Sequence, residues 1–336
     1  MLAIQNLKST VSSFTAGMLL ATALVGNAQA QQDLTQEQQD LLLAPAGRIS
    51  MTIGAPIMMK STDFEWAHQI LVALPASYDT QPDKKYPVLW VTDGNSINLP
   101  VGILELLVSA GLAPEMIIVG VGMPSELGMA EFVRRRITDF APPGDKFFAD
   151  GVAGDALKNS QYGAYVGSLP RKGDKFLDFL IDEVRPALAK KYRMSGDHGL
   201  YGHSAGGMFT GYAIFARPGD FSKYIVGSPS LFAVDRKAFQ LEEEYAKNHK
   251  DLNVSVFFGA GELEIHNTFL AGWSVVSSPV LMAETLQLRQ YPSLKVTTRI
   301  FHGKDHATVV PETLRKGITT LWADDAVPIT YAGQSD

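Results

Sequence analysis

The chain has 336 residues, 46% of them hydrophobic, with a formal net charge of −6 and no cysteine. A mildly acidic protein is poorly suited to bind nucleic acid or an anionic membrane, because both carry negative charge. The lack of cysteine excludes disulfides, thiolate catalysis and cysteine-bound metals. No motif indicates a metal or an organic cofactor, and the sequence leaves the oligomeric state open.

The first thirty residues have the features of a cleavable signal peptide. They contain one charged residue, Lys8, and an apolar run, and they end in Ala28-Gln29-Ala30, the small-x-small pattern that signal peptidase cuts. The apolar run is shorter than the ~20 residues of a membrane-spanning helix. We therefore expect cleavage after Ala30 and a mature protein that is periplasmic or secreted. No other stretch suggests a membrane span.

The remaining sequence predicts one large domain. Residues 31–48 are polar and suggest an N-terminal arm, residues 49–325 form the expected domain, and residues 326–336 form a C-terminal tail. No stretch has the composition of a linker. Residues 123–170 are rich in glycine and proline, and we expect them to form a small irregular cap.

Expected strands and helices alternate along this domain. Apolar runs predict strands within 48–59, 68–75, 86–94, 116–122, 198–204, 224–230, 254–261 and 295–303. Helical spacing predicts helices within 97–111, 174–192, 205–218, 235–249, 281–291 and 312–325, the second of them kinked at Pro186. This order predicts a mostly parallel sheet with helices on both faces. Ligands bind such sheets at the carboxyl ends of the strands.

A serine lies between one expected strand and the helix after it. The pentapeptide Gly202-His203-Ser204-Ala205-Gly206 fits G-x-S-x-G, the nucleophile elbow. Its two glycines would allow a sharp turn that exposes the Ser204 hydroxyl at the edge of the sheet. The helix that begins at Ala205 would aim backbone N–H groups at developing negative charge. Ser204 is therefore the candidate nucleophile.

A serine hydroxyl needs a general base, and the chain offers seven histidines. Of the four after the elbow, His249 lies in a charged stretch typical of an exposed helix end, and His302 ends a strand. His306 follows in the loop before the last helix, and we favour it as the base. His266 stays an outside candidate. We expect His203 to support the elbow and to contact substrate.

The third member of a triad should be a carboxylate between the serine and the histidine in chain order. Glu262 and Glu264 both follow the strand within 254–261, and either could orient the imidazole. Asp305 should point away from the serine if His306 points toward it. The residues themselves leave the choice between the two glutamates open.

An oxyanion hole needs two hydrogen-bond donors. One should be the N–H of Ala205, the residue after the nucleophile. The other should come from the loop that follows the strand within 86–94, where Gly94 and Asn95 are the candidates.

These motifs resemble the esterase family of α/β hydrolases that includes esterase D, enterochelin-type siderophore esterases and feruloyl esterases. The resemblance rests on "VALPASYD…YPVLWVTDGN", "RRRITDFAPP", "LYGHSAGGMFTGYAIFARPGDFSKYIVGSPSLF", "VFFGAGELE" and "FHGKDHATVVPETLRKGI". It runs from about residue 50 to 323 and implies the α/β-hydrolase fold. The "GELE" segment is closer to the siderophore-esterase branch than to the formylglutathione branch.

By position, the family nucleophile falls on Ser204, its base on His306 and its acid on Glu264. Some siderophore esterases work with a Ser–His dyad, so the acid is the member that the resemblance fixes least. The family arginine thought to contact substrate matches Arg135 or Arg136. The chain departs from the pattern in having no run of basic residues suited to a trianionic ferric catecholate complex.

The sequence thus predicts an exported serine carboxylic-ester hydrolase with a small-molecule ester substrate, no metal and no cofactor. Phe147, Phe148 and Tyr162 are expected in the cap over the alcohol or acyl pocket. Two alternatives are acyl transfer to an alcohol acceptor and a catalytically silent binding protein. The identity of the ester is left open.

Overall fold

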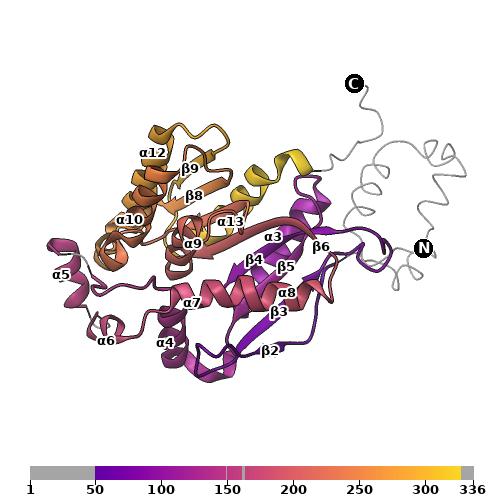
Figure 1. The fold of residues 1–336 in the computed structure, drawn as a ribbon, viewed down its shortest axis with the longest axis horizontal. Helices are drawn as coiled ribbons and strands as arrows, with labels where there is room; N and C mark the ends of the chain where they lie inside the picture. Colours follow the sequence, from indigo (N-terminus) through magenta and orange to yellow (C-terminus); the bar gives the residue numbers. More distant parts are fainter. Residues whose placement is uncertain (1–49, 149, 161–162, 327–336) are drawn as a thin grey trace, which may run out of the picture.

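The computed structural model describes residues 50–148, 150–160 and 163–326. The predicted signal peptide, the N-terminal arm, Tyr162 and nearly all of the tail lie outside the described residues. The described chain folds around one nine-stranded sheet (Figure 1). Its strands are β1 (Thr52–Ile53), β2 (Ile57–Met59), β3 (His68–Leu74), β4 (Tyr86–Thr92), β5 (Ile117–Gly122), β6 (Met194–His203), β7 (Lys223–Gly227), β8 (Ser255–Gly261) and β9 (Lys295–Phe301).

The sheet is mixed but mostly parallel, as the sequence predicted. Its strand order is β1-β3-β5-β4-β6-β7-β8-β9, and β2 also pairs with β3. Strands β4 to β9 pair in parallel, whereas β3 runs antiparallel to β5 and to both short strands. All the carboxyl ends of β4 to β9 therefore lie along one edge. The candidate residues Ser204, Glu264 and His306 follow three of these ends.

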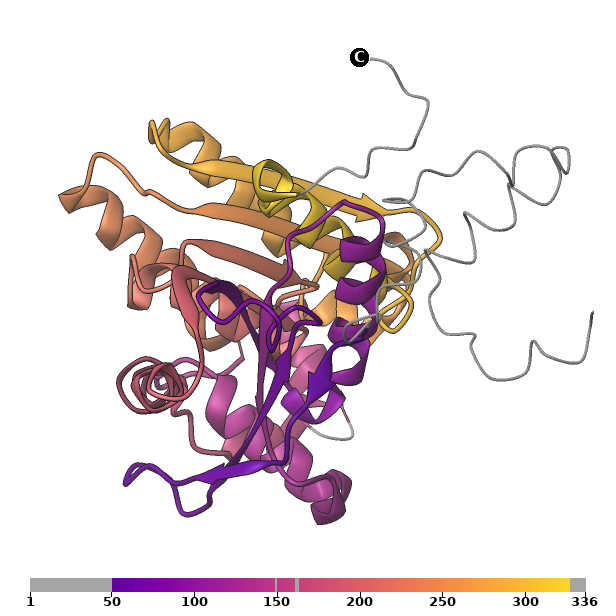
Figure 2. The same ribbon diagram turned by 90° about the vertical axis from the view of Figure 1, so that its right-hand side faces the viewer.

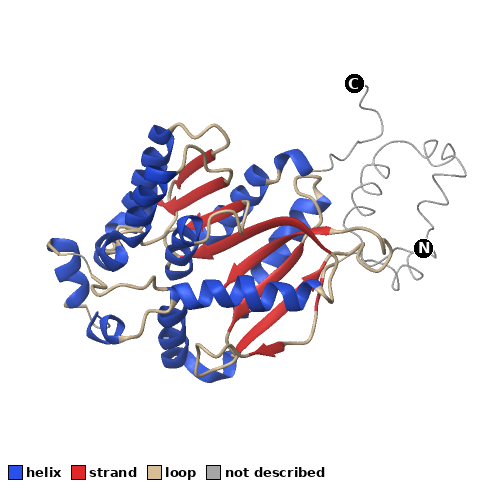
Figure 3. Ribbon diagram, in the orientation of Figure 1, coloured by secondary structure: helices blue, strands red, loops and turns tan. Residues whose placement is uncertain are grey.

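Helices cover both faces, which confirms the predicted α/β architecture (Figures 2 and 3). One face packs against α3 (Asn98–Ser109) and α13 (Val309–Leu321). The helices that contribute to the core on the opposite face are α7 (Gly173–Asp178), η3 (Phe179–Val184), α8 (Arg185–Ala189), α9 (Ala205–Ala216), α10 (Ala233–Asn248) and α12 (Ser277–Arg289). Central strands are buried on both sides, and this explains their continuous apolar sequences.

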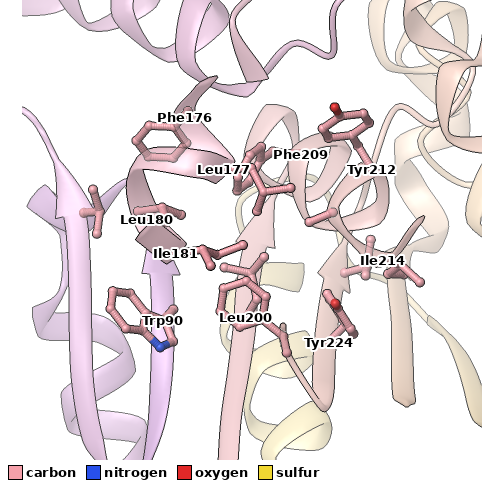
Figure 4. Packing of buried hydrophobic residues seen from close by; sticks show 14 of the residues in the cluster. Trp90, Phe176, Leu177, Leu180, Ile181, Leu200, Phe209, Tyr212, Ile214 and Tyr224 are labelled. Carbon is pink, nitrogen blue, oxygen red and sulfur yellow. The ribbon is translucent and has the colours of Figure 1, made fainter. Parts of the chain in front are cut away.

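The larger core lies between the sheet and the helices α7, η3 and α9 (Figure 4). Trp90 of β4 and Leu200 of β6 face Phe176 of α7 and Phe209 of α9 across this layer, and each is at most 1% exposed. Burying one such side chain contributes about 1.5–3 kcal/mol. This layer holds β6 and α9 in fixed relation, and the turn between them carries Ser204.

The interruption expected at Pro186 is present. The six residues before it, Phe179–Val184, form a π-helical turn between α7 and α8. Proline lacks an N–H and its ring collides with the carbonyl four residues earlier, so a regular α-helix cannot continue through this position. The wider turn relieves that collision.

The section 123–170, expected to be irregular, contains helices. They are η2 (Ser125–Leu127), α4 (Gly128–Phe140), α5 (Val152–Lys158) and α6 (Gly163–Ser168), and they lie beyond the carboxyl ends of the strands (Figure 1). The expectation was wrong for α4, where Glu131 forms ion pairs with both Arg134 and Arg135. Ion pairs at these spacings stabilise a helix. The glycines and prolines on either side had suggested irregular structure instead.

One helical stretch of the described chain, Thr268–Arg289, has the length and the mean hydropathy, 1.3, of a membrane-spanning helix. The sequence prediction had overlooked it. It divides into α11 (Thr268–Gly272) and α12, and the α12 residues Met282 and Leu286 are buried in the protein core. These buried side chains pack in the core, whereas Phe269 and Leu288 of the same stretch are exposed.

Candidate active site

Ser204 occupies a strained turn between β6 and α9. Its backbone angles are φ 60° and ψ −118°, which a residue with a side chain rarely adopts. Its N–H donates to the carbonyl of Gly227 at 2.9 Å, which ties the turn to β7. Such strain costs on the order of 1–3 kcal/mol and is typical of functional positions. The turn has the conformation of a nucleophile elbow.

The two elbow glycines are required by close backbone approach. A Cβ on Gly202 would collide with the carbonyl of Gly206, and a Cβ on Gly206 would collide with the hydroxyl of Thr92 on β4. The glycines at these positions therefore make the turn sterically possible, which is the reason that the G-x-S-x-G pattern predicted it.

Glu264 and His306 meet beside this turn. Glu264 lies in the 3₁₀ turn η4 (Glu262–His266) after β8, and His306 lies in the loop between β9 and α13. Nδ1 of His306 is 2.5 Å from Oε1 of Glu264. Glu264 is completely buried, whereas the His306 side chain is 30% exposed. A buried carboxylate on Nδ1 orients the imidazole and leaves Nε2 for proton transfer.

Two further donors hold the Glu264 carboxylate. Ser228 Oγ donates to Oε2 at 3.0 Å, and the Gly261 N–H donates to the same oxygen at 2.6 Å. Ser228 is itself fully buried after β7. This serine was not among the predicted site residues, and its only signal was its place near the end of the strand expected within 224–230, "YIVGSPS".

Glu262 pairs with a different histidine. Its carboxylate lies 2.6 Å from Nδ1 of His302, whose side chain is 94% exposed, and it accepts from the N–H of Gly303. Asp305 accepts from the backbone N–H groups of Ala307 and Thr308 and so shapes the loop that carries the base. Glu264 is the only buried residue of η4, whereas Glu262 lies at the surface with His302.

The other two downstream histidines are exposed. His249 stacks on Tyr245 at the end of α10, with a ring-centroid distance of 3.9 Å. His266 is exposed at the last position of η4.

His203 links His306 to the elbow. The two imidazole rings lie with their centroids 4.5 Å apart, and His203 directly precedes Ser204. Burial lowers the pKa of His203 well below its ordinary value, and the neighbouring His306 and Arg136 act in the same direction. The His203 imidazole is therefore uncharged, and the His306 ring packs against it.

The proposed oxyanion donors lie on the two sides of the elbow. Ala205 begins α9, and the first N–H groups of a helix have no partner within it. Gly94 and Asn95 begin the turn η1 (Gly94–Ser96) directly after β4. A Cβ on Gly94 would collide with the backbone at Gly120 of β5, so this glycine permits close packing of the loop.

The two candidate arginines make different contacts. Arg135 Nε donates to Glu131 at 2.6 Å and its Nη1 donates to the carbonyl of Ala67. Arg136 Nε donates to both carboxylate oxygens of Asp93, and its Nη2 donates to the carbonyl of His203. Both arginines line a cavity of about 270 Å³ together with Asn95.

A second cavity lies under the cap. Its volume is about 300 Å³, and Phe147, Phe148 and Trp273 are among the residues that line it. Phe147 and Phe148 belong to an apolar cluster that also contacts Ala205 at the start of α9. This places the aromatic side chains expected in the cap close to the elbow. Among residues 50–148, 150–160 and 163–326, no group of three or more acidic or histidine side chains is arranged to bind a metal ion.

Comparisons with known proteins identify a family and several relatives of this chain. Residues 126–307 match the family described as "Putative esterase". The chain is 26% identical over 262 residues to the siderophore triacetylfusarinine C esterase of Aspergillus fumigatus, covering 71% of this chain and 82% of that protein. It is 24% identical over 266 residues to the ferri-bacillibactin esterase BesA of Bacillus subtilis, covering 76% and 84%.

A solved structure shares the fold. The siderophore hydrolase EstB from Aspergillus nidulans superposes with a TM-score of 0.65 at 23% identity, covering 82% of this chain and 97% of that one. The α/β-hydrolase fold and the resemblance to siderophore and related esterases are thereby confirmed. The family match spans more than half of the chain, including the elbow, Glu264 and His306. The chain therefore belongs to this esterase family of α/β hydrolases and is a carboxylic ester hydrolase.

Proposed function

We propose that the protein is a serine esterase that works through an acyl-enzyme, with Ser204 as nucleophile, His306 as general base and Glu264 as the orienting acid. The observation that carries this proposal is the hydrogen bond of 2.5 Å between His306 Nδ1 and the buried Glu264. The same imidazole packs on His203, the residue before the strained serine. Serine, carboxylate and histidine also follow one another along the chain in the order typical of this fold.

The reaction proceeds in two balanced steps. Ser204 Oγ attacks the ester carbonyl while His306 Nε2 accepts the hydroxyl proton, and collapse of the tetrahedral intermediate releases the alcohol, which takes that proton. Water then attacks the acyl-serine, again with His306 as base, and releases the carboxylic acid and free Ser204. Glu264 stays ionised throughout and stabilises the imidazolium that forms in each step.

Negative charge develops on the carbonyl oxygen in both steps. The N–H groups of Ala205 and of Gly94 or Asn95 are the donors we assign to it, and one such donor contributes about 3–4 kcal/mol in a well-studied serine protease. These groups are held by the backbone, so they need no reorganisation when the charge appears. His203 supports the elbow beside them.

We infer that the substrate is a siderophore-type ester. The names of the two related esterases support this class, and so does the aromatic lining of the cavity under the cap. The net charge of −6 favours a metal-free or smaller ester over a trianionic ferric complex. A hydrolysis screen over short acyl, feruloyl, acetyl-sugar and siderophore esters, each with and without iron where relevant, tests this choice.

Export is part of the proposal. The first thirty residues support cleavage after Ala30 and a periplasmic or secreted mature protein. The test is to determine the N-terminal residue of the protein recovered from each cell fraction and from the medium. Recovery of only the uncleaved chain from the cytoplasm would contradict this part.

The mechanism is tested by rapid kinetics with p-nitrophenyl acetate. We expect a burst of p-nitrophenol equal to the number of active sites when deacylation is the slower step, and an acetyl group on Ser204 in the quenched protein. Ser204→Ala should lose both. Full activity in Ser204→Ala would exclude this mechanism.

A further inference from the structure

We propose that Arg136 is a positioning residue that holds the two sides of the oxyanion hole together, and that it does not bind substrate. This inference depends on the proposed serine mechanism and goes beyond it. Arg136 Nε donates to Asp93 Oδ1 at 2.8 Å and to Oδ2 at 3.0 Å. Its Nη2 donates to the carbonyl oxygen of His203 at 3.0 Å. One guanidinium thus joins helix α4 to the ends of β4 and β6.

The two residues that Arg136 contacts lie next to the proposed oxyanion donors in the sequence. Asp93 directly precedes Gly94, and His203 precedes Ser204 and Ala205. Asp93 has a left-handed backbone, with φ 54° and ψ 45°, which aspartate adopts more readily than most residues. The ion pair to Arg136 adds a tertiary contact that fixes this loop relative to helix α4.

The charge of Arg136 is already neutralised. The Arg136 and Asp93 side chains are 20% and 21% exposed, so their ion pair is largely shielded from water. Phe132 and Phe140 lie near the guanidinium, with ring centroids 5.6 and 5.9 Å from its central carbon. An anionic substrate group would have to displace Asp93 to reach the same nitrogen. Substrate binding at this position would therefore disrupt the loop that carries Gly94.

Loss of this clamp should affect the transition state more than the bound substrate. Oxyanion donors act by being fixed in place before charge appears, and a misplacement of about 1 Å can reduce the rate about 10²-fold. A neutral ester binds through other contacts, so its KM should change little. A substrate-binding arginine would show the opposite pattern, with KM raised and kcat kept.

The experiment measures kcat and KM for p-nitrophenyl acetate, a small neutral ester, in Arg136→Gln and Arg136→Lys. Rates are divided by the burst amplitude, so that unfolded protein does not count. We expect kcat to fall at least tenfold in Arg136→Gln, with KM within threefold of the wild type. Arg136→Lys should recover part of the rate, because one ammonium cannot make both contacts in the same geometry.

Arg134→Gln is the matched control. Arg134 lies on the same helix, where it pairs with Glu131, packs over Trp66 and accepts a hydrogen bond from Thr138 through its carbonyl oxygen. We expect its kcat to stay within twofold of the wild type. An equal loss of kcat in Arg134→Gln would show that helix stability, and not the clamp, governs the rate.

A double-mutant cycle identifies the partner. Asp93→Asn alone should lower kcat, and adding Arg136→Gln should cause little further loss, because either change already breaks the link between the two loops. If Arg136→Gln does not fold, Asp93→Asn with a native melting temperature decides the question by its own kcat. Unchanged kcat in Asp93→Asn would then overturn the clamp.

The outcomes separate this inference from the proposed function. If Ser204→Ala keeps full activity, the serine mechanism fails and the clamp fails with it. If the wild type shows its burst but Arg136→Gln raises only KM, the clamp is wrong and Arg136 is a substrate contact. If KM for anionic esters rose more than KM for p-nitrophenyl acetate, this would further support a role of Arg136 in substrate binding.

Discussion

Glu264 and His306 are joined by a hydrogen bond of 2.5 Å between a fully buried carboxylate and a partly exposed imidazole. The difference in burial fits the proposed roles, because a general base must reach its nucleophile while its orienting partner stays fixed. The pair Glu262–His302, only a few residues away, has the same chemistry on the surface. The two pairs therefore form a natural comparison.

The first prediction concerns these two glutamates. Glu264→Gln should lower kcat for p-nitrophenyl acetate by about 10²–10⁴-fold, because an amide can stabilise the wrong imidazole tautomer and cannot neutralise the imidazolium. Glu262→Gln should leave kcat within about twofold. Steady-state kinetics at pH 7.5, with melting temperatures as a check on folding, measure both. Equal small effects would indicate a Ser–His dyad.

The second prediction concerns the support of the acid. Ser228→Ala removes the hydroxyl that donates to Glu264 Oε2, and hydrogen bonds to charged groups contribute about 1.5–3 kcal/mol. Ser230→Ala removes a bond to the neutral carbonyl of Trp273 and should cost about 1 kcal/mol. Urea denaturation measures the free energy of unfolding of both variants. If Ser228→Ala costs no more than Ser230→Ala, the Ser228 hydroxyl does not support an ionised Glu264.

The third prediction concerns the elbow. Gly202→Ala should lower the free energy of unfolding by at least about 1–3 kcal/mol and abolish activity. The reason is that the Cβ of the new alanine collides with the backbone of Gly206. Gly196 is a control on the same strand, where a Cβ meets nothing within 4 Å. Gly196→Ala should change stability by less than about 0.5 kcal/mol. Denaturation and kcat distinguish the two variants, and a tolerated Gly202→Ala would contradict the steric argument.

Much of the fold was predictable because its signals are local. Each buried strand of the parallel sheet is a short apolar run, and the turn at Ser204 depends on two glycines within five residues. For the cap, the sequence indicated its position in the chain but not its helices. Helix α4 depends on the ion pairs of Glu131 and on packing against other elements, and composition alone does not reveal either.

The contacts that complete the site are long-range and were not predictable. Glu262 and Glu264 look equivalent in sequence, and only the turn η4 directs one outward and the other inward. Ser228 reaches Glu264 across 36 residues, and Arg136 reaches Asp93 across 43. No local pattern indicates which distant side chain will fill such a position, so the sequence suggested candidate reacting residues but not the residues that contact them.

The last prediction concerns pH and lies at the other end of the sheet. Burial lowers the pKa of His198 to about 4, with Arg185 acting in the same direction, and Trp90 Nε1 donates to its Nδ1. In the unfolded chain the same imidazole takes up a proton below about pH 6.5, whereas the folded protein excludes that proton until about pH 4. Proton binding therefore favours the unfolded state in this window.

The contribution of His198 to stability is fully present above pH 6.5 and is lost as the pH falls toward 4. His198→Gln keeps an acceptor for Trp90 but does not titrate, so the unfolding free energy should fall less between pH 6.5 and 4 than in the wild type. The difference should be roughly 3 kcal/mol at most. His249→Gln, at the exposed end of α10, should follow the wild-type curve. Urea denaturation across this range measures all three proteins, and parallel curves for wild type and His198→Gln would show that His198 is protonated in the folded state.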